Sequence, residues 1–493
     1  MRVLIFHGYL LRGTGSNIYN VSLARALAAL GHEVCLVCQE RAPEGLGLPA
    51  AVEIVNPDIG RVLPVYVADR YEGFDAVRFA ELDDATLDRY LEANVTAVRS
   101  AADRFGPDLA LANHAVMGPA ILARALGGRT PYAVKIHGSA LEYTVRPQPE
   151  RFLPYMREGL DRAAGVLVGS RHTAESLWEV AGDPGLPART RLGPPGVDVD
   201  AFRPCPPAEA AARLTALADR LEGSEGPLWG GEKGASAALR AFDPRRERIV
   251  GYVGKLIVSK GVDLLLAAWP LVHARAPDAR LLVVGFGAYR AALGELVEAL
   301  GRGDLDAVAT LAARGRGAEG GEEAPLSYLT AFLDGLEGGA RRAYLAAAPA
   351  AAAAVRFTGA LHHGDLPDVL PAFTAQVVPS TFPEAFGMVA AEAACCGALP
   401  LSADHSGLAE VTAALAGAVA PELRELLSFE RGPGAVEAIA ARLTRWLELP
   451  AAERERASAA LAERAGGRFG WEAVAEGVLA AAHGDLDELA PVG

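Results

Sequence analysis

Short, mainly apolar runs recur along the chain and are separated by segments of helical length. In the first 200 residues they lie at 3–6, 34–37, 109–112, 132–136 and 166–168. Runs that are apolar on both faces are typical of parallel strands covered by helices. The pattern begins again after a long interruption, with runs at 249–253, 281–284, 355–358, 376–378 and 398–401. The chain is therefore predicted to form two doubly wound α/β domains.

A segment rich in glycine and proline interrupts the pattern, and the hinge between the domains is predicted there, at 193–205. The first domain is expected to span 1–200, followed at 201–246 by the rest of the hinge and an inserted helix and loop. The second domain is expected at 247–470. Within it, a tract at 301–354 rich in Ala, Gly, Arg and Glu is predicted to be partly helical and partly mobile.

The length of 493 residues agrees with two domains, because a single core rarely grows beyond about 250 to 300 residues. A formal net charge of −14 argues against a nucleic-acid partner, which needs a basic protein face to displace counterions. An anionic ligand must therefore be bound by a local group of cations.

Several features favour a cytoplasmic protein. Residues 1–8 are predicted to form a strand and lack the pattern of a signal peptide. The alanine-rich stretch at 345–355 is shorter than the ~20 apolar residues that span a bilayer. Five cysteines cannot all pair, which favours a reducing compartment. No transmembrane segment is expected, and peripheral membrane contact stays open.

Cys35 and Cys38 have the spacing of a metal or redox pair. They fall within the apolar region around 34–37, where successive side chains of a strand point to opposite faces. We therefore interpret both as buried strand cysteines.

An acidic motif follows the predicted strand 376–378. The sequence at 379–393 predicts an irregular loop and then a helix from about Phe386, with Glu384 just before the helix and Glu392 about two turns inside it. The unpaired amides at such a helix end attract phosphate. Glu384 could bind sugar hydroxyls and Glu392 both ribose hydroxyls. The helix dipole equally permits Glu384 to be a simple acidic cap.

Lysine is almost absent from the chain, since only four of its 47 basic residues are lysine. Two of the four, Lys255 and Lys260, lie in one loop after the predicted strand 249–253. In open α/β sheets ligands bind at this edge. The two ammonium groups are therefore predicted to bind a diphosphate and to stabilise the charge of a leaving group.

A glycine-rich loop, Gly13-Thr14-Gly15, precedes a predicted helix at 18–30, and its amides could contact the same diphosphate. Glu40 lies where a dinucleotide-binding fold keeps its ribose acid. In that fold the glycines follow the strand directly, whereas residues 9–12 intervene here, so an NAD site is disfavoured.

Polar residues also end two strands of the first domain. His137 follows the strand 132–136 and is expected to face the ligand, although a structural histidine fits the same place. Asn113 and His114 end the strand before it and are candidates for the acceptor side.

Taken in order, seven segments resemble those of the retaining glycosyltransferases of the GT-B fold, family 4. They are the first glycine-rich loop, Gly193-Pro194-Pro195-Gly196-Val197-Asp198 with Phe202, the Lys255/Lys260 loop, Phe357-Thr358-Gly359, Glu384 with Glu392, Ser406-Gly407-Leu408-Ala409-Glu410-Val411, and Trp471-Glu472. The resemblance implies two Rossmann-like domains facing a central cleft, with a terminal helix at 471–485 that crosses back to the first domain.

The resemblance also implies roles for individual residues. Glu384 would contact donor-sugar hydroxyls, Glu392 the ribose, and His137 the region beside the sugar. Lys255 and Lys260 would bind the diphosphate, which Gly15 approaches by its backbone. The backbone amides of Phe386, Gly387, Met388 and Val389 would face sugar and phosphate. Family members commonly carry arginine where Lys255 stands. The lysine of this chain keeps the positive charge but lacks the fork geometry of a guanidinium group.

The expected function is transfer of a hexose from a nucleoside-diphosphate sugar, with a UDP-sugar favoured, to a hydroxyl acceptor held mainly by the first domain. The resemblance implies a retaining reaction in which the leaving phosphate helps to deprotonate the acceptor. Asp198 and Asp200 are interpreted as turn or cap residues rather than metal ligands. Because two lysines supply the charge, no metal and no further cofactor are expected.

Three other functions fit parts of the pattern. A non-catalytic nucleotide-sugar sensor would share the fold and the binding site. A GT-B epimerase would need additional acids near the anomeric carbon. A pyridoxal-phosphate phosphorylase would need a Schiff-base lysine, and the few lysines already have other predicted places.

Overall fold

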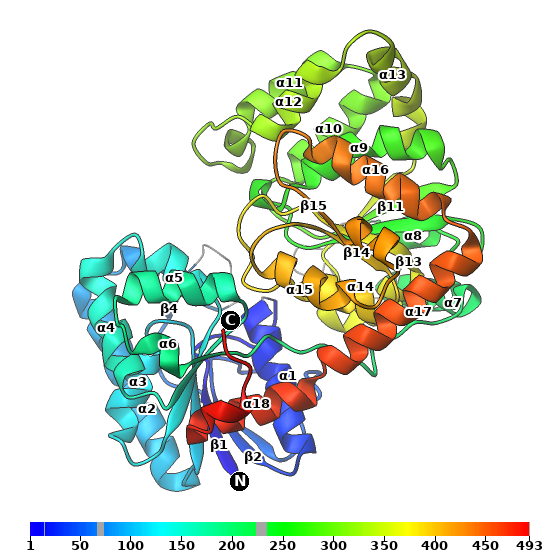
Figure 1. Ribbon diagram of the computed structural model, residues 1–493. Coiled ribbons are helices and arrows are strands. Elements are labelled where there is room, and N and C mark those ends of the chain that lie inside the picture. Colours follow the sequence, from blue (N-terminus) through cyan, green and yellow to red (C-terminus); the bar gives the residue numbers. More distant parts are fainter. Residues whose placement is uncertain (14, 67–72, 223–233, 493) are drawn as a thin grey trace. The chain divides into compact units, whose positions relative to one another are not determined.

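The computed structural model describes residues 1–13, 15–66, 73–222 and 234–492. Thr14 of the first glycine-rich loop and residues 223–233, in the region predicted as an inserted helix and loop, lie outside the described residues. The chain divides into two compact units (Figure 1), one formed by Met1–Asp198 with Phe469–Gly493 and the other by Val199–Arg468.

The first unit is built on a parallel sheet in the order β3-β2-β1-β6-β7-β8-β9. Its strands are β1 Arg2–Phe6, β2 Glu33–Val37, β3 Val52–Val55, β6 Leu109–Asn113, β7 Tyr132–Ile136, β8 Gly165–Val168 and β9 Thr190–Leu192. The five predicted strands are confirmed. The edge strands β3 and β9 were missed because they are short and only partly buried.

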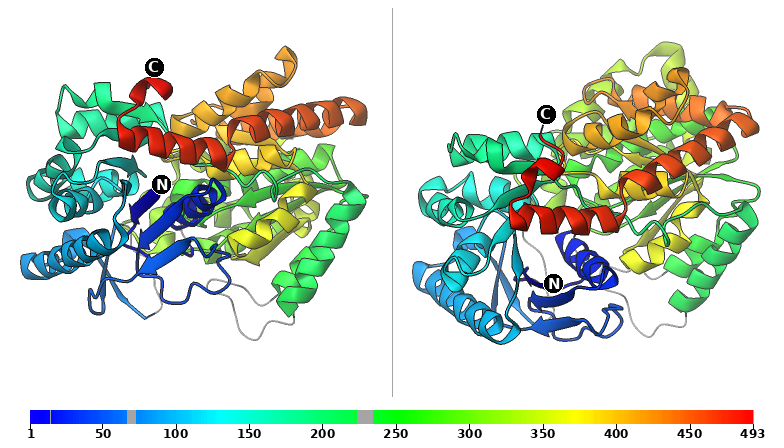
Figure 2. Two further views of the ribbon diagram at one scale, coloured as in Figure 1. Left: turned by 90° about the horizontal axis from the view of Figure 1, so that it is seen from below. Right: turned by 60° about the horizontal axis from the view of Figure 1, so that its bottom comes forward.

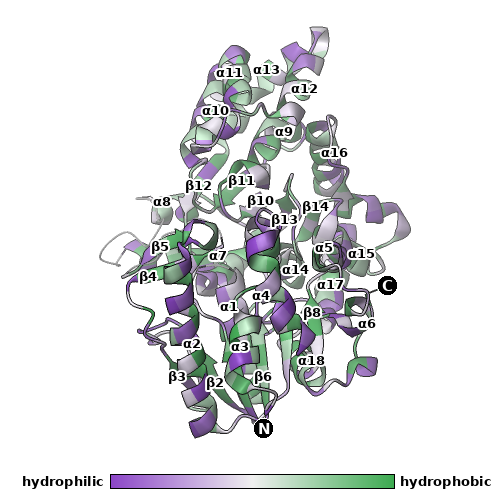
Figure 3. Cartoon of the chain, turned by 90° about the vertical axis from the view of Figure 1, so that its left-hand side faces the viewer, coloured by the Kyte–Doolittle hydropathy of each residue, from purple (hydrophilic) through white to green (hydrophobic). Residues whose placement is uncertain are grey.

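Helices cover both faces of this sheet. They are α1 Gly15–Ala29, α2 Asp84–Phe105, α3 Gly118–Leu126, α4 Pro149–Asp161, α5 Arg171–Ala181, α6 Leu186–Arg189 and α18 Trp471–His483, and a small ribbon pairs β4 Val62–Val65 with β5 Asp75–Arg78. Figure 3 shows hydrophobic β6 and β8 in green, whereas the visible side of α2 carries hydrophilic residues in purple. Figure 2 shows α18 in red, and this helix packs against α1, β6, β7 and β8.

Each face of the sheet has its own hydrophobic core. Cys35 belongs to the core on one face and Cys38 to the core on the other, and both side chains are fully buried. Burial raises the pKa of both thiols, that of Cys38 to about 12. The interpretation as buried cysteines on opposite faces is confirmed, but only Cys35 lies in β2, and Cys38 follows the strand directly.

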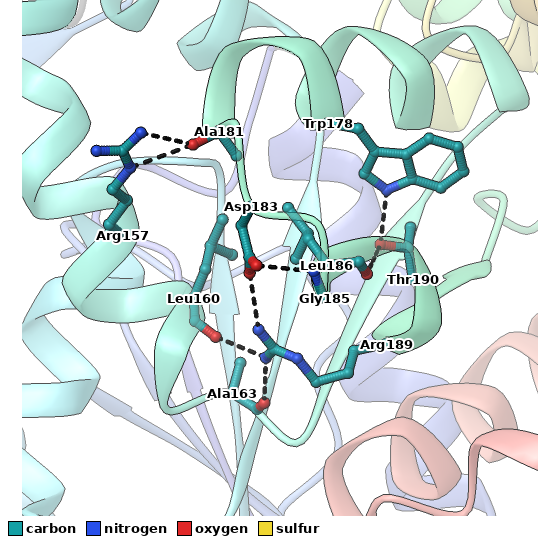
Figure 4. Close-up of polar contacts among 10 residues, drawn as sticks. All are labelled: Arg157, Leu160, Ala163, Trp178, Ala181, Asp183, Gly185, Leu186, Arg189 and Thr190. Carbon is teal, nitrogen blue, oxygen red and sulfur yellow. Dashed lines mark hydrogen bonds and ion pairs between the residues drawn. The ribbon is translucent and has the colours of Figure 1, made fainter.

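The turn that leads into β9 is fixed by polar contacts to backbone carbonyls (Figure 4). Arg189 Nη1 donates to the carbonyls of Leu160 and Ala163 at 2.8 and 3.0 Å. Trp178 Nε1 donates to Thr190 Oγ1 at 3.0 Å, and Thr190 Oγ1 donates to the Leu186 carbonyl at 2.8 Å. These bonds attach the edge strand to the helices α4, α5 and α6.

The second unit contains a parallel sheet in the order β12-β11-β10-β13-β14-β15. Its strands are β10 Arg248–Val253, β11 Ala279–Val284, β12 Val355–Gly359, β13 Phe373–Val378, β14 Leu399–Ala403 and β15 Ser428–Phe429. The five predicted strands are confirmed, and the two-residue β15 was missed. The predicted fold class of two doubly wound, Rossmann-like halves is therefore correct.

The helices of this unit include three that lie in the compositionally biased tract 301–354. Among its described residues, the unit's helices are α7 Pro207–Glu222, α8 Ala235–Arg240, α9 Val262–Arg275, α10 Arg290–Arg302, α11 Leu305–Arg314, α12 Ser327–Gly335, α13 Gly338–Ala353, α14 Met388–Cys395, α15 Ser406–Ala416, α16 Ala435–Glu448 and α17 Ala451–Arg468. Two short 3₁₀ turns matter for the site, η3 Val258–Lys260 and η4 Arg316–Glu319.

The expectation that part of the tract 301–354 is helical is confirmed, because α11, α12 and α13 lie in it. Aromatic side chains attach its last helix to the rest of the unit. Trp269 Nε1, from α9, donates to the Ala351 carbonyl at 3.1 Å, and Tyr344 Oη donates to the Ala267 carbonyl at 2.9 Å. Both aromatic side chains are at most 1% exposed. Two large buried residues thus attach α13 to α9 despite the low aromatic content of the tract.

Among the described residues, no helix is both long enough and apolar enough to cross a membrane.

The sheet of the second unit leaves no room for a side chain at Gly251 in β10. A Cβ atom there would lie 2.0 Å from Cε2 of Phe373 in β13. We expect Gly251→Ala to lower the free energy of unfolding by about 1–3 kcal/mol, the usual cost of overpacking. Gly335→Ala at the end of α12 is the matched control, since its Cβ would meet no atom within 4 Å. Chemical denaturation of both variants measures this, and equal stabilities would contradict the packing argument.

Candidate functional site

The strand order places one switch point in each sheet. In the second unit β10 and β13 are neighbours, and their chain connections leave in opposite directions. Ligands of open α/β sheets bind outside the carboxyl ends of the strands at such a point. The two predicted ligand loops, 254–261 after β10 and 379–387 after β13, both begin there.

Lys260 and Glu384 meet at this switch point. Lys260 Nζ forms an ion pair with Glu384 Oε1, and the two side chains are 29% and 21% exposed. Ser380 Oγ donates to the same carboxylate oxygen at 2.5 Å. Two residues predicted from separate motifs are thus brought into direct contact. Ser380 was not predicted, although it lies in the acidic motif at the end of β13.

The pKa of Glu384 lies below its ordinary value. Burial alone would raise it, but the charge and hydrogen bond of Lys260, the Ser380 hydroxyl and the nearby His405 together outweigh burial. Glu384 is therefore a carboxylate at neutral pH. An ionised carboxylate accepts hydrogen bonds, which suits the hydroxyl groups of a sugar.

The loop that carries Glu384 is held by the start of α15. The Glu384 amide donates to Ser406 Oγ at 2.8 Å, and the Gly407 amide donates to the Glu384 carbonyl at 3.0 Å. A Cβ on Gly407 would lie 2.5 Å from Phe386 Cα, so only glycine permits this approach. His405 Nε2 also donates to the Ser380 carbonyl at 2.7 Å. His405 was not predicted, although its neighbours Ser406 and Gly407 were.

The helix after the motif begins two residues later than predicted, at Met388. The residue before it, Gly387, has φ 110°, and no side chain caps the helix. Its first turn contains Met388 and Val389, which are partly exposed, whereas Phe386 is buried. A helix end without a side-chain cap leaves amide donors for an anion.

Glu392 lies inside α14 and contacts His363 rather than Glu384. It is 2% exposed, and His363 Nε2 lies 2.7 Å from Glu392 Oε1. His363, 30% exposed, packs its ring 5.4 Å from that of Phe202. His363 was missed because its segment, between β12 and β13, carried no motif. The histidine orients the carboxylate that was predicted to bind a ribose.

The lysine loop is fixed by its backbone. Tyr252 Oη donates to the Lys255 carbonyl at 2.8 Å, and the Thr381 amide donates to the Ser259 carbonyl at 2.9 Å. Gly261, with φ 64°, allows the loop to turn into α9, and a Cβ there would lie 2.0 Å from the Pro379 carbonyl oxygen. The loops that carry Lys260 and Glu384 are therefore in direct backbone contact.

The first unit has a buried polar chain at its own switch point, between β1 and β6. His137 Nε2 donates to Asn113 Oδ1 at 2.7 Å, and Asn113 Nδ2 donates to Asn20 Oδ1 at 2.8 Å. Asn20 Nδ2 lies 3.0 Å from His7 Nδ1, and His7 Nε2 lies 2.9 Å from Asn17 Oδ1. The predicted residues His137 and Asn113 thus belong to one network with His7, which follows β1, and with two asparagines of α1.

The histidines of this network are neutral near pH 7. Burial lowers the pKa of His7 to about 4. It also lowers the pKa of His137 well below the ordinary value, and neighbouring His114 and Lys135 add to the effect. His114 itself has φ 70° and both ring nitrogens buried without a hydrogen-bond partner, and burial lowers its pKa as well. Neutral rings of this kind can bind hydroxyl groups but add no charge for a phosphate.

The remaining predicted positions of the first unit lie around α1. Gly15 is its exposed first residue. Glu40 is buried and accepts hydrogen bonds from the amides of Leu11 and Ala42 at 3.2 and 3.1 Å. Both carboxylate oxygens of Glu40 are thus used to hold the loop before α1, which is a structural role and not that of a ribose acid.

In the described parts of the chain, no three His, Cys, Asp or Glu side chains are grouped so that they could hold a metal ion.

Family models match three stretches of the chain. Residues 14–196 match the description "Glycosyl transferase 4-like domain", and residues 247–313 and 335–464 match "Glycosyl transferases group 1". The first stretch lies in the first unit and the other two lie in the second. The chain belongs to the glycosyltransferases of the GT-B fold, family 4 type, a class of hexosyltransferases.

Curated relatives carry names within this class. A D-inositol 3-phosphate glycosyltransferase of Frankia alni is 28% identical over 94% of this chain and 93% of that protein. One from Segniliparus rotundus is 30% identical over 60% of this chain, and the match spans 46% of that protein, less than half of its length. A GDP-mannose-dependent alpha-(1-6)-phosphatidylinositol monomannoside mannosyltransferase of Mycolicibacterium smegmatis is 30% identical over 38% of this chain and 40% of that protein.

The fold also matches solved structures. The Anabaena protein HepE in complex with UDP and glucose superposes with a TM-score of 0.57 at 17% identity, covering 97% of this chain and 98% of that chain. At this identity the likeness shows the fold alone.

The lowered pKa of Glu384 predicts a pH-dependent contribution to stability. A carboxylate whose folded-state pKa is depressed stabilises the fold above its ordinary pKa, and this is lost as the pH falls through the folded-state value. We expect Glu384→Gln to be less stable than wild type by about 1 kcal/mol at pH 7, and the difference to shrink below about pH 4. Thermal unfolding of both proteins between pH 7 and 3 measures it.

Glu437→Gln, on the exposed side of α16, is the control and should show no such trend. A wild-type advantage over Glu384→Gln that stays the same at every pH would mean that the ionised pair does not stabilise the fold.

Proposed function

We propose that the chain is a retaining glycosyltransferase that moves a hexose from a nucleoside-diphosphate sugar to a hydroxyl acceptor, with the donor bound by the second unit. The contact between Lys260 and Glu384 is the observation that carries this proposal. In such a donor the sugar is bonded directly to the diphosphate. A cation for the phosphates and a carboxylate for the sugar hydroxyls must therefore be neighbours, as they are here.

The lysines are suited to stabilise the leaving group. When the bond between the anomeric carbon and the phosphate oxygen breaks, negative charge grows on the diphosphate. Lys255 and Lys260 lie on one loop at the carboxyl end of β10, where their ammonium groups can meet that charge. Because two ammonium groups supply this charge, we propose a reaction that does not depend on a metal ion.

Glu384 is better suited to bind the sugar than to attack it. Its Oε1 already accepts from both Lys260 and Ser380, which reduces its nucleophilicity. A double displacement through this carboxylate is therefore disfavoured. We propose a front-face reaction, in which the acceptor oxygen bonds to the anomeric carbon on the side that the diphosphate leaves. The proton of the acceptor hydroxyl passes to the departing phosphate oxygen.

The nucleoside is assigned to α14. Glu392 is held by His363, which leaves the carboxylate oriented for two ribose hydroxyls. The start of α14, with Gly387 in the left-handed region, offers backbone amides to the phosphates. In the first unit His137 and Gly15 are assigned to the sugar and diphosphate, as the family resemblance implies.

The donor is proposed to be a UDP-sugar. The Anabaena structure of the same fold holds UDP and glucose, and the mannosyltransferase relative is named for GDP-mannose, so both nucleotides belong in the donor test. Two relatives are named for an inositol phosphate acceptor, which makes a polyol hydroxyl the first acceptor class to test.

Replacing Glu384 by Gln and Lys260 by Ala should each lower donor kcat/KM at least about 100-fold, since each removes a charged contact made to the reacting group. Hydrolysis of UDP-, GDP- and ADP-sugars, followed by transfer assays with the best donor, provides the measurement. Glu437→Gln is the control for an exposed carboxylate and should retain full activity.

Undiminished turnover in Glu384→Gln would contradict the proposed donor site. Binding of a nucleotide sugar without any turnover, measured by calorimetry, would instead indicate a non-catalytic sensor.

A further inference from the structure

A segment of the second unit lies outside the family pattern and touches the lysine loop. Residues 314–334 fall between the two stretches that match the family models. They contain η4 and all but the last residue of α12, part of the tract whose composition was biased. The family resemblance therefore assigns no role to this segment.

Glu319, the last residue of η4, makes the contact. Its Oε2 accepts a hydrogen bond of 2.8 Å from the amide of Val258, which is 61 residues away in the sequence. Val258 is the first residue of η3, the turn that ends with Lys260. The residue before it, Ile257, has no side-chain acceptor and makes no cap hydrogen bond. Glu319 thus caps the lysine-bearing turn from a distant segment.

The carboxylate is itself held in place. Its side chain is only 14% exposed, and its other oxygen lies 3.6 Å from Arg316 Nε. A hydrogen bond closes the turn that carries Glu319. The Arg316 amide donates to the Ala324 carbonyl at 3.2 Å. Gly315 permits this closure, because a Cβ there would lie 1.8 Å from the same carbonyl oxygen. Glu319 is therefore presented by a fixed turn.

The lysine turn is held from its other side by the acidic motif. The Thr381 amide and Oγ1 both donate to the Ser259 carbonyl, at 2.9 and 3.2 Å. Val258 and Ser259 are consecutive, so η3 is clamped between Glu319 on one side and Thr381 on the other. Lys260 follows directly, and its backbone position depends on both contacts.

We propose that Glu319 is a positioning residue for donor binding, which holds η3 so that Lys255 and Lys260 face the diphosphate. This inference rests on the proposed function of the lysines. Glu319 acts through the Val258 amide and touches neither donor nor acceptor. A segment found outside the family pattern thereby takes part in the stabilisation of the leaving group.

The expected result of Glu319→Ala is about tenfold weaker binding of UDP or GDP, because a buried amide loses its acceptor and the turn relaxes. Binding of uridine or guanosine, which carry no phosphate, should stay unchanged. A general loss of stability would weaken both ligands alike. Glu319→Gln keeps an acceptor oxygen and should recover most of the diphosphate affinity.

The experiment is calorimetry of the full chain with UDP, GDP and the two nucleosides, for wild type, Glu319→Ala, Glu319→Gln and the control Glu322→Ala. Glu322 is an exposed carboxylate three residues further on. Hydrogen exchange of the peptide that contains Val258 should be faster in Glu319→Ala only. In Glu319→Ala/Lys260→Ala the two losses should not add, since both act on one contact with the diphosphate.

Equal diphosphate affinity in Glu319→Ala and wild type would overturn the inference while leaving the proposed function intact. An equal loss for nucleoside and diphosphate would overturn it as well, because the effect would then be general. If the wild-type protein binds no nucleoside diphosphate, ADP included, the proposed function fails and the inference fails with it.

Discussion

The convergence of strand ends at a switch point is the constraint on which the second unit depends. A parallel sheet delivers the loops after β10 and β13 to the same edge, and their backbones then contact each other through Thr381 and Ser259. This brings a cation and a carboxylate into contact, although 124 residues separate Lys260 from Glu384. The strand order thus accounts for the electrostatics of the site. Each charge is stabilised by the other, so neither needs to be fully exposed to water.

Much of the fold could be predicted because buried parallel strands leave a strong signal. Each of the ten apolar runs predicted a strand that the structure contains. The scarcity of lysine elsewhere indicated that the loop after β10, with two lysines, is a ligand loop. The edge strands β3, β9 and β15 were missed, since short strands that are only half buried share no such pattern. The helices of the tract 301–354 were predicted in part, but the contacts of Trp269 and Tyr344 that attach α13 to α9 were not, because average composition does not show them.

The partners of the site residues were beyond prediction for a different reason. His363, His405 and Glu319 are each defined by a contact across long sequence separations, and nothing in their local sequence indicates it. A motif predicts which groups are presented at a sheet edge. It does not predict which distant side chains orient them, because that depends on the packing of loops whose conformation the local sequence leaves open.

The buried polar chain of the first unit also fixes the position of a proton. Backbone carbonyls can only accept, so the amide group of Asn113 must point to Phe6 and its oxygen to His137. His137 Nε2 must then carry the hydrogen, which leaves Nδ1 of the neutral ring as a lone pair. The tautomer of the histidine that follows β7 is thus set by a carbonyl of β1. If a ligand meets Nδ1, as the proposed function requires, this nitrogen can only accept a hydrogen bond, which fits a hydroxyl group and not an anion.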